Sequence, residues 1–493
     1  MENVGSKMAK GAIWMVFLRL SIKGIGIIST LILARLLTPD DFGLMALGTS
    51  IYAIVELMRA FGFDTVLIQN QKSDRSHYDT AWTMQIIFSL IASSLIIAIS
   101  DYAADYYNDS RLADVLKVMS LLILINGFNN IGVVEFRKKM TFNKEFAYQV
   151  LIKLSGFCVT IPLAWYLRSY WALLMGLLSA NITSLILSYT MQKYRPRVCL
   201  DAWRELMSFS SWLMVNNVFL FIYQHGQNFI LAKMIAPASV GLYAITNEIS
   251  SITTSELVGA VNRAAFPGYS SVNENLVKLT ELYLKTLGLI AFIIIPCCVG
   301  ISAVALIMVP VVLGDKWIEI IPLMELIAFS NIFIGLGTNL SSVFLAIKLQ
   351  KLNLLYNILR SFMFISLVVY FIEQYNLVGI GYAMVVTSIA MYFFTLILSK
   401  MFLNLSLYDS LSRIIRPGFA SSIMYVSLLY YYDIYTDLTA LNLFLGVMLG
   451  AILYALSIVI LWICSGRPDG VERQIIMKFT KKAIFYEKKR TNS

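Results

Sequence analysis

Two basic residues lie in the middle of the first apolar stretch of the chain. Arg19 and Lys23 are four residues apart, which places both side chains on one face of a helix. Burying an ionisable group in lipid costs about 2.5 to 3.5 kcal/mol on the insertion scale, so such groups usually face a bundle interior or a water-filled cavity. Arginine and lysine bind phosphate groups through charge-assisted hydrogen bonds. The pair therefore predicts a cationic face for an anion such as a pyrophosphate.

Other ionisable residues in apolar stretches differ in sign between the two halves of the chain. The N-terminal half adds mostly bases: Arg59, Lys117 and Lys153, against Glu56. The C-terminal half has mostly acids: Glu248, Glu256 and Glu325, against Arg360. The candidate cations for the pyrophosphate are Arg19, Lys23, Arg59, Lys153, Arg263 and Arg360. Glu56, Glu248 and Glu256 are candidates for coupling or gating, with Glu248 favoured as the coupling carboxylate. Glu56 and Arg59 are equally consistent with a structural ion pair, and Lys117 and Lys153 with snorkelling toward the interface.

Side-chain amides crowd one later apolar stretch, around the sequence "YQHGQN". The candidates are Asn216, Asn217, Gln224, Gln227 and Asn228, next to His225. Such residues either line a polar cavity that handles sugars or form interhelical hydrogen bonds, which are common in membrane bundles. The same two interpretations apply, with less weight, to Asn126, Asn129, Asn130, Asn331 and Asn339.

These residues are set in a strongly apolar chain. Of 493 residues, 58% are hydrophobic and only 14% are charged, against about a quarter charged in soluble domains. The composition indicates an all-α polytopic membrane protein. No cofactor or metal is expected, because the five cysteines lack zinc-site spacing and there are only two histidines. The net charge of +10 is explained by basic cytoplasmic loops, so nucleic-acid binding is not expected.

Apolar segments long enough to cross a membrane recur along the whole chain. We expect fourteen spans, at 11–33, 41–62, 81–100, 112–134, 148–167, 170–190, 208–231, 239–262, 284–309, 321–347, 353–373, 377–399, 414–432 and 440–464. Loops after even-numbered spans are rich in Lys and Arg, which places both termini in the cytoplasm. The predicted location is the bacterial cytoplasmic (inner) membrane.

One motif occurs twice and divides the chain. "LARLLTPDDFGLMA" (Leu33–Ala46) and "LAKMIAPASVGLYA" (Leu231–Ala244) align without a gap at an offset of 198 residues. Six spans separate them, so the two repeats have the same orientation, and transporters built this way hold substrate between two lobes. The predicted organisation is an N-lobe at 1–199, a C-lobe at 200–400, two extra spans at 401–466 and a basic cytoplasmic tail at 467–493.

Four segments together resemble the polysaccharide transporter family. They are "LARLLTPDDFGLMA", "FGFDTVLIQ" (Phe61–Gln69), "FRKKMTFNK" (Phe136–Lys144) and "LGDKWIEIIPLMELIA" (Leu313–Ala328). Members include flippases for O-antigen, colanic-acid and teichuronic-acid repeat units. The resemblance implies the multidrug/oligosaccharidyl-lipid/polysaccharide (MOP) superfamily fold, with two six-helix lobes in a V. It also implies an undecaprenyl-pyrophosphate-linked oligosaccharide as substrate, moved between leaflets by alternating access.

The resemblance also implies residue roles and partners. The related lipid II flippase has cavity arginines on its first, second and eighth helices, to which Arg19, Arg59 and Arg263 are the nearest positions. Spans thirteen and fourteen are candidates for a lipid-tail groove. Expected partners are membrane lipids, the lipid-linked oligosaccharide, a polysaccharide polymerase and a chain-length regulator. No Walker A motif, G-x-x-x-x-G-K-[ST], is present, so transport would be driven by an H+ or Na+ gradient or by consumption of the product outside.

The sequence leaves three alternative functions open. An ion-coupled drug or small-cation antiporter of the MATE type predicts a cavity dominated by acids and aromatic residues, which the Arg19 and Lys23 face argues against. A polysaccharide polymerase or ligase needs a sizeable outer loop, and the longest here is about a dozen residues. A structural partner in polysaccharide assembly does not account for charges in the middle of the spans.

Overall fold

A computed structural model describes residues 4–57, 67, 74–139, 141–272, 274–347, 349–435, 437–466 and 472–473, with side chains left out at 4–13, 16, 55–57, 205–217, 219–220 and 350. Every regular element in these ranges is helical. Nine of the described helices are long and apolar enough to cross a membrane, or ten if one bent pair counts as a single span. The total of fourteen spans stays a prediction.

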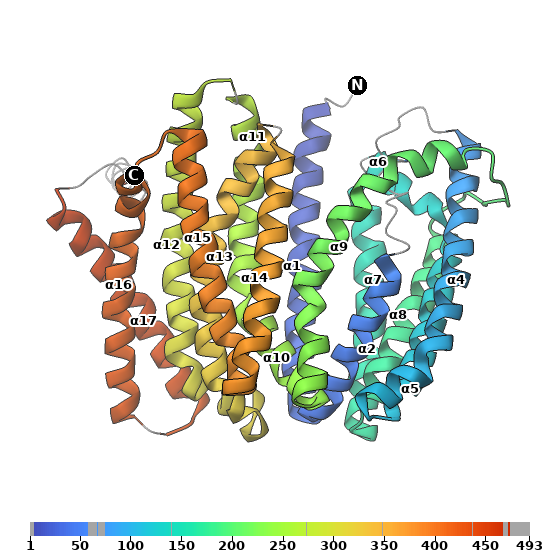
Figure 1. Ribbon diagram of the computed structural model, residues 1–493, viewed down its shortest axis with the longest axis horizontal. Helices are drawn as coiled ribbons and strands as arrows, with labels where there is room; N and C mark the ends of the chain where they lie inside the picture. The colour runs from blue at the N-terminus through green and yellow to red at the C-terminus, as the bar shows by residue number, and fades with distance from the viewer. Residues whose placement is uncertain are drawn as a thin grey trace, which may run out of the picture. The chain divides into compact units, whose positions relative to one another are not determined.

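The chain divides into two compact units, Met1–Ile245 and Thr246–Ser493. In Figure 1 the helices of the first unit, blue to green, run side by side as long rods. The elements that begin in it are α1 (Val4–Leu36), α2 (Pro39–Leu57), α4 (Arg75–Tyr107), α5 (Arg111–Gly127), η1 (Ile131–Val134), α6 (Glu135–Lys138), α7 (Phe142–Leu167), α8 (Trp171–Thr190), α9 (Trp203–Met234) and α10 (Pro237–Ser250). Because α9 packs against α2 and α4, it groups with the first unit, although the sequence repeat starts a new copy there.

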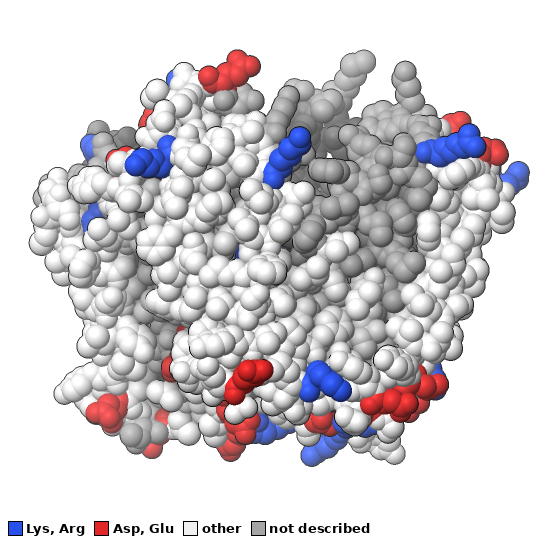
Figure 2. All heavy atoms as spheres, viewed as in Figure 1, with Lys and Arg blue, Asp and Glu red and all other residues white. Residues whose placement is uncertain are grey.

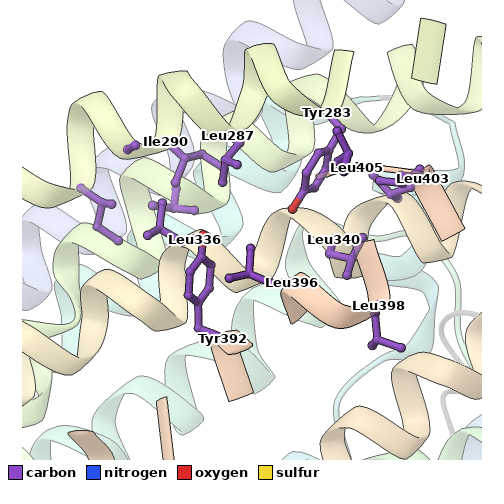
Figure 3. Packing of buried hydrophobic residues seen from close by; sticks show 14 of the residues in the cluster. Tyr283, Leu287, Ile290, Leu336, Leu340, Tyr392, Leu396, Leu398, Leu403 and Leu405 are labelled. Carbon is purple, nitrogen blue, oxygen red and sulfur yellow. The ribbon is translucent and has the colours of Figure 1, made fainter. Parts of the chain in front are cut away.

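The second unit is built around α12. Its elements are η2 (Thr253–Val258), α11 (Gly259–Ser271), α12 (Leu276–Met308), η3 (Val309–Leu313), η4 (Asp315–Ile320), α13 (Ile321–Ala346), α14 (Gln350–Tyr375), α15 (Val378–Leu403), α16 (Leu407–Ile434) and α17 (Ala440–Cys464). Figure 3 shows Tyr283 and Leu287 of α12, Leu336 of α13, and Tyr392 and Leu396 of α15 converging in its buried core. The last two helices pack on the other side of this scaffold, through buried α12 residues such as Ala303 and Ile307.

The two copies of the repeated motif contact each other within the first unit. A Cβ built on Gly43 would lie 2.0 Å from the carbonyl oxygen of Pro237, and one built on Gly241 would lie 2.1 Å from that of Pro39. Each proline is the first residue of its helix, where it needs no backbone hydrogen bond. The motif is therefore more than a tight turn, because each copy provides the glycine against which the other copy packs.

Two expected spans are interrupted. The segment expected to be one helix at 112–134 breaks between α5 and η1, with a 70° bend. The oxygen Oδ1 of Asn130 caps the new start by accepting from the Gly132 backbone N–H at 2.9 Å, which favours a new helical start over continuation. The segment expected at 239–262 contains the π-helix η2, and so Glu248 and Glu256, eight residues apart, are not related by a regular α-helical period that would place them on one face.

Candidate functional site

The cations of α1 lie on the face that points away from its neighbour α7. Trp14 and Phe17 both pack on Phe146 of α7, with ring centroids 5.0 and 5.4 Å apart. At 100° per residue, Arg19 and Lys23 fall on the opposite side of the helix. Arg19 is exposed and Lys23 half-buried, and within the described residues neither side chain has a hydrogen-bond or ion-pair partner. No described residue neutralises the positive charge of this face.

The packing of α1 on α7 brings a third cation to the same depth. The two helices run parallel, since Phe17 contacts Phe146 near their starts and Leu33 packs in one cluster with Ala164 near their ends. Lys153 follows Phe146 by about the same number of residues as Lys23 follows Phe17, so it lies level with Lys23. Lys153 is exposed. Lys117, by contrast, is ion-paired to Asp101 at 2.8 Å at the far end of α4.

The amides of α9 separate into two groups. Gln227 and Asn228 are 2% and 8% exposed. Asn228 donates to the Ser50 hydroxyl of α2 at 2.8 Å, and Gln227 donates to the Tyr243 hydroxyl of α10 at 3.3 Å. Both therefore hold neighbouring helices together in this structure, whereas Gln224 is exposed and available to a ligand. The side chains of Asn216 and Asn217 are outside the described ones.

The structure places several predicted residues of the second unit on different helices. Glu248, Glu256 and Arg360 are half-buried, on α10, η2 and α14 respectively. Arg263 is exposed on α11, and its Nη1 lies 3.3 Å from where a Cβ on Gly259 would stand. Arg59 lies outside the described residues, as does the side chain of Glu56, so both interpretations of this pair stay predictions.

The break after α5 forms a polar pocket that the sequence marked only weakly, through Asn126, Asn129 and Asn130. Its volume is about 350 Å³. Its wall comes from α4, α5, η1, α6, α7 and α8, and includes Gln85, Asn126, Asn129, Arg137, Glu145, Gln149, Asn181 and Ser184. The sequence signal that was missed is the presence of amides on three other spans, at 85, 149 and 181, which line one pocket together with the broken span at 112–134.

Comparisons with known proteins agree with this architecture. The lipid II flippase MurJ in an inward closed conformation superposes with a TM-score of 0.72 at 16% sequence identity, covering 93% of this chain and all of that one. The lipopolysaccharide biosynthesis protein WzxC of Escherichia coli (strain K12) is 23% identical over 74% of this chain and 75% of its own. The succinoglycan biosynthesis transport protein ExoT of Rhizobium meliloti (strain 1021) is 21% identical over 64% of this chain and 65% of its own.

Fold and comparisons together define the class of this molecule as a multi-span membrane protein with a fold like that of the lipid II flippase MurJ. A family model described as "polysaccharide biosynthesis protein" matches residues 32–322, which is more than half of the chain. The chain belongs to this family. The resemblance drawn from the four sequence motifs is thereby confirmed.

Proposed function

We propose that the chain is a flippase for undecaprenyl-pyrophosphate-linked oligosaccharide repeat units. It moves them across the bacterial cytoplasmic membrane by alternating access, for synthesis of a surface polysaccharide. The observation that carries the proposal is the cationic face of α1, where neither Arg19 nor Lys23 has a partner among the described residues. A pyrophosphate supplies the negative charge that such a face lacks. The relatives named for lipopolysaccharide and succinoglycan biosynthesis support the choice of a glycan substrate.

In this proposal each part of the substrate has a different environment. The pyrophosphate binds Arg19 and Lys23, the sugars pass polar side chains such as Gln224, and the polyprenyl chain stays in lipid. Residues 1–199 and 200–400 act as two six-helix lobes, both termini are cytoplasmic, and a polymerase with its chain-length regulator receives the product. Glu248 couples transport to H+ or Na+.

The double substitution Arg19→Ala with Lys23→Ala tests the cationic face. In cells that lack the native gene, we expect the variant to lower polymer export at least tenfold while a lipid-linked repeat unit accumulates inside. Export is measured as surface polysaccharide, and protein level by immunoblot of membranes.

Lys117→Ala is the matched control, because this lysine sits in an apolar stretch of the same unit but is already paired with Asp101. It should export as the wild type does. Full export by the double variant at wild-type protein level would refute the role of the face. A deletion strain that still makes all its polysaccharides and accumulates no lipid-linked intermediate would refute the flippase assignment.

A further inference from the structure

The polar pocket at the broken span presents hydrogen-bond acceptors that the protein does not use. The amide nitrogen of Asn181 donates to the Leu177 carbonyl at 2.7 Å, and that of Gln149 donates to Glu145 at 3.3 Å. That of Gln85 donates to the carbonyl of Asn126 at 2.8 Å. Their side-chain oxygens accept no hydrogen bond from any residue that the structure describes. The amides are thus held through their nitrogens, with their oxygens left for donors of a ligand.

Asn129 shows the same pattern, and its unused side-chain oxygen is also buried. Its nitrogen donates to Asn126 at 3.1 Å and to the Ser184 hydroxyl at 3.2 Å. Its Oδ1 is shielded from solvent and has no partner in the described part of the chain. An unmet buried acceptor costs about 1 to 3 kcal/mol, so a ligand hydroxyl that reaches it gains a hydrogen bond that water does not already supply.

The charged pair in the wall leaves the pocket close to neutral. Arg137 Nη2 lies 2.6 Å from Glu145 Oε1, and Arg137 Nε also donates to that oxygen, at 2.9 Å. The Glu145 side chain is only 4% exposed. All of its hydrogen bonds in the described region go to Oε1, which leaves Oε2 as a further acceptor. Because Arg137 is already neutralised, the pocket is poorly suited to a pyrophosphate.

The ligand that fits is small, uncharged and rich in hydroxyl groups. Each sugar hydroxyl carries one O–H donor, and the wall presents mainly acceptors. A volume of about 350 Å³ lies at the lower end of the usual range for small-molecule sites, about 300 to 1,000 Å³. We propose that this pocket binds a neutral glycosyl unit of the transported oligosaccharide, apart from the cations that hold its pyrophosphate. This proposal rests on the function proposed above.

Two substitutions remove unused acceptors while keeping side-chain size. Asn181→Leu and Gln149→Met are combined in the full-length protein, purified in lipid nanodiscs. Binding of methyl α-glucoside, methyl α-galactoside, N-acetylglucosamine and inorganic pyrophosphate is measured by saturation-transfer difference NMR. We expect at least one of the sugars to bind the wild type, and the double variant to weaken that binding at least tenfold while its pyrophosphate binding is unchanged.

Asn143→Leu is the matched control, since this amide is exposed on the same helix as Gln149 but is absent from the pocket wall. It should bind sugar as the wild type does, and size-exclusion profiles check that all variants are folded. The pocket assignment is overturned if none of the three sugars binds the wild type, or if the double variant binds them equally well. In either case the flippase assignment stands or falls separately, on loss of polymer from the deletion strain and its rescue by the wild-type gene.

Discussion

At the scale of single residues, one buried carboxylate anchors an irregular segment to the helices beneath it. Asp79 is 6% exposed on α4. Its Oδ1 accepts from the Tyr194 hydroxyl and, at 2.8 Å, from the backbone N–H of Arg197. Burial raises the pKa of Tyr194, and the hydrogen bond to Asp79 acts in the same direction. The segment at 191–202 has no regular structure, and these two bonds tie its middle to α4.

Asp79→Ala should therefore release this segment. Losing the acceptor leaves buried donors unmet, at a cost of about 1 to 3 kcal/mol. The segment contains Lys193 and Arg197, neither of which precedes a proline, so trypsin reports its release directly. We expect cleavage after Lys193 and after Arg197 in inside-out vesicles to be at least fivefold faster than in the wild type, as followed by mass spectrometry.

Asp101→Ala, at the opposite end of the same helix, is the control, since it removes an exposed ion pair with Lys117. Cleavage of that variant should match the wild type. Equal cleavage rates for Asp79→Ala and the wild type would show that other contacts hold the segment.

At the scale of elements, the two helical hairpins cross where the repeated motif places its glycines. A Cβ at Gly43 has no room, because the atom it meets at 2.0 Å is a backbone oxygen rather than a movable side chain. Small residues permit such close approach between membrane helices. The crossing explains why the motif needs glycine at this position in both copies.

Gly43→Ala should lower stability by about 1 to 3 kcal/mol, the usual cost of overpacking. The measurement is the melting temperature of a detergent-solubilised GFP fusion, followed by size exclusion, and Gly241→Ala should behave alike. Gly24→Ala is the control, since nothing lies within 4 Å of its added Cβ and alanine favours a helix over glycine. An equal melting temperature for Gly43→Ala and Gly24→Ala would contradict the close crossing.

The spans and the repeat were readable from the sequence, whereas the interruptions were not. Apolar length and the matched Pro-Gly motifs are local signals, and α7, α8, α13 and α15 lie close to their expected positions. The break at Asn130 is stabilised by partners far away in sequence, such as the Tyr194 carbonyl, which accepts from its side chain at 2.7 Å. The helix-joining role of Asn228 likewise needs Ser50, 178 positions away. Tertiary partners of this kind leave no mark on local periodicity.

At the scale of the whole molecule, charge gathers at the ends of the helices. Figure 2 shows Lys, Arg, Asp and Glu along two edges of the visible face, with few in the band between. At one end of the first unit, Arg75 contacts the segment at 191–202, because the Nη2 of Arg75 donates to the Arg195 carbonyl at 3.4 Å. The other end holds Asp40 and Asp109, both bound to Arg111. This asymmetry supports the proposed orientation, with the basic end in the cytoplasm.

Reporter fusions check this orientation. Alkaline phosphatase fused after Asp109 should be active, and the same enzyme fused after Lys139 inactive, because only folding outside the cytoplasm forms its disulfides. GFP fused at the same two positions should give the converse pattern. Phosphatase activity after Lys139 would reverse the assigned orientation.

The reciprocal contact of the hinge motifs has a consequence for how this chain can change over generations. Since the Gly43 site receives an oxygen from the second copy, and Gly241 one from the first, a mutation in either copy alters the surroundings of the other. The two repeats can diverge in their substrate-facing helices, yet at this crossing the residues of one repeat constrain those of the other. A bulkier residue in one half becomes tolerable only after a matching change in the other, so these positions should mutate in pairs or stay fixed.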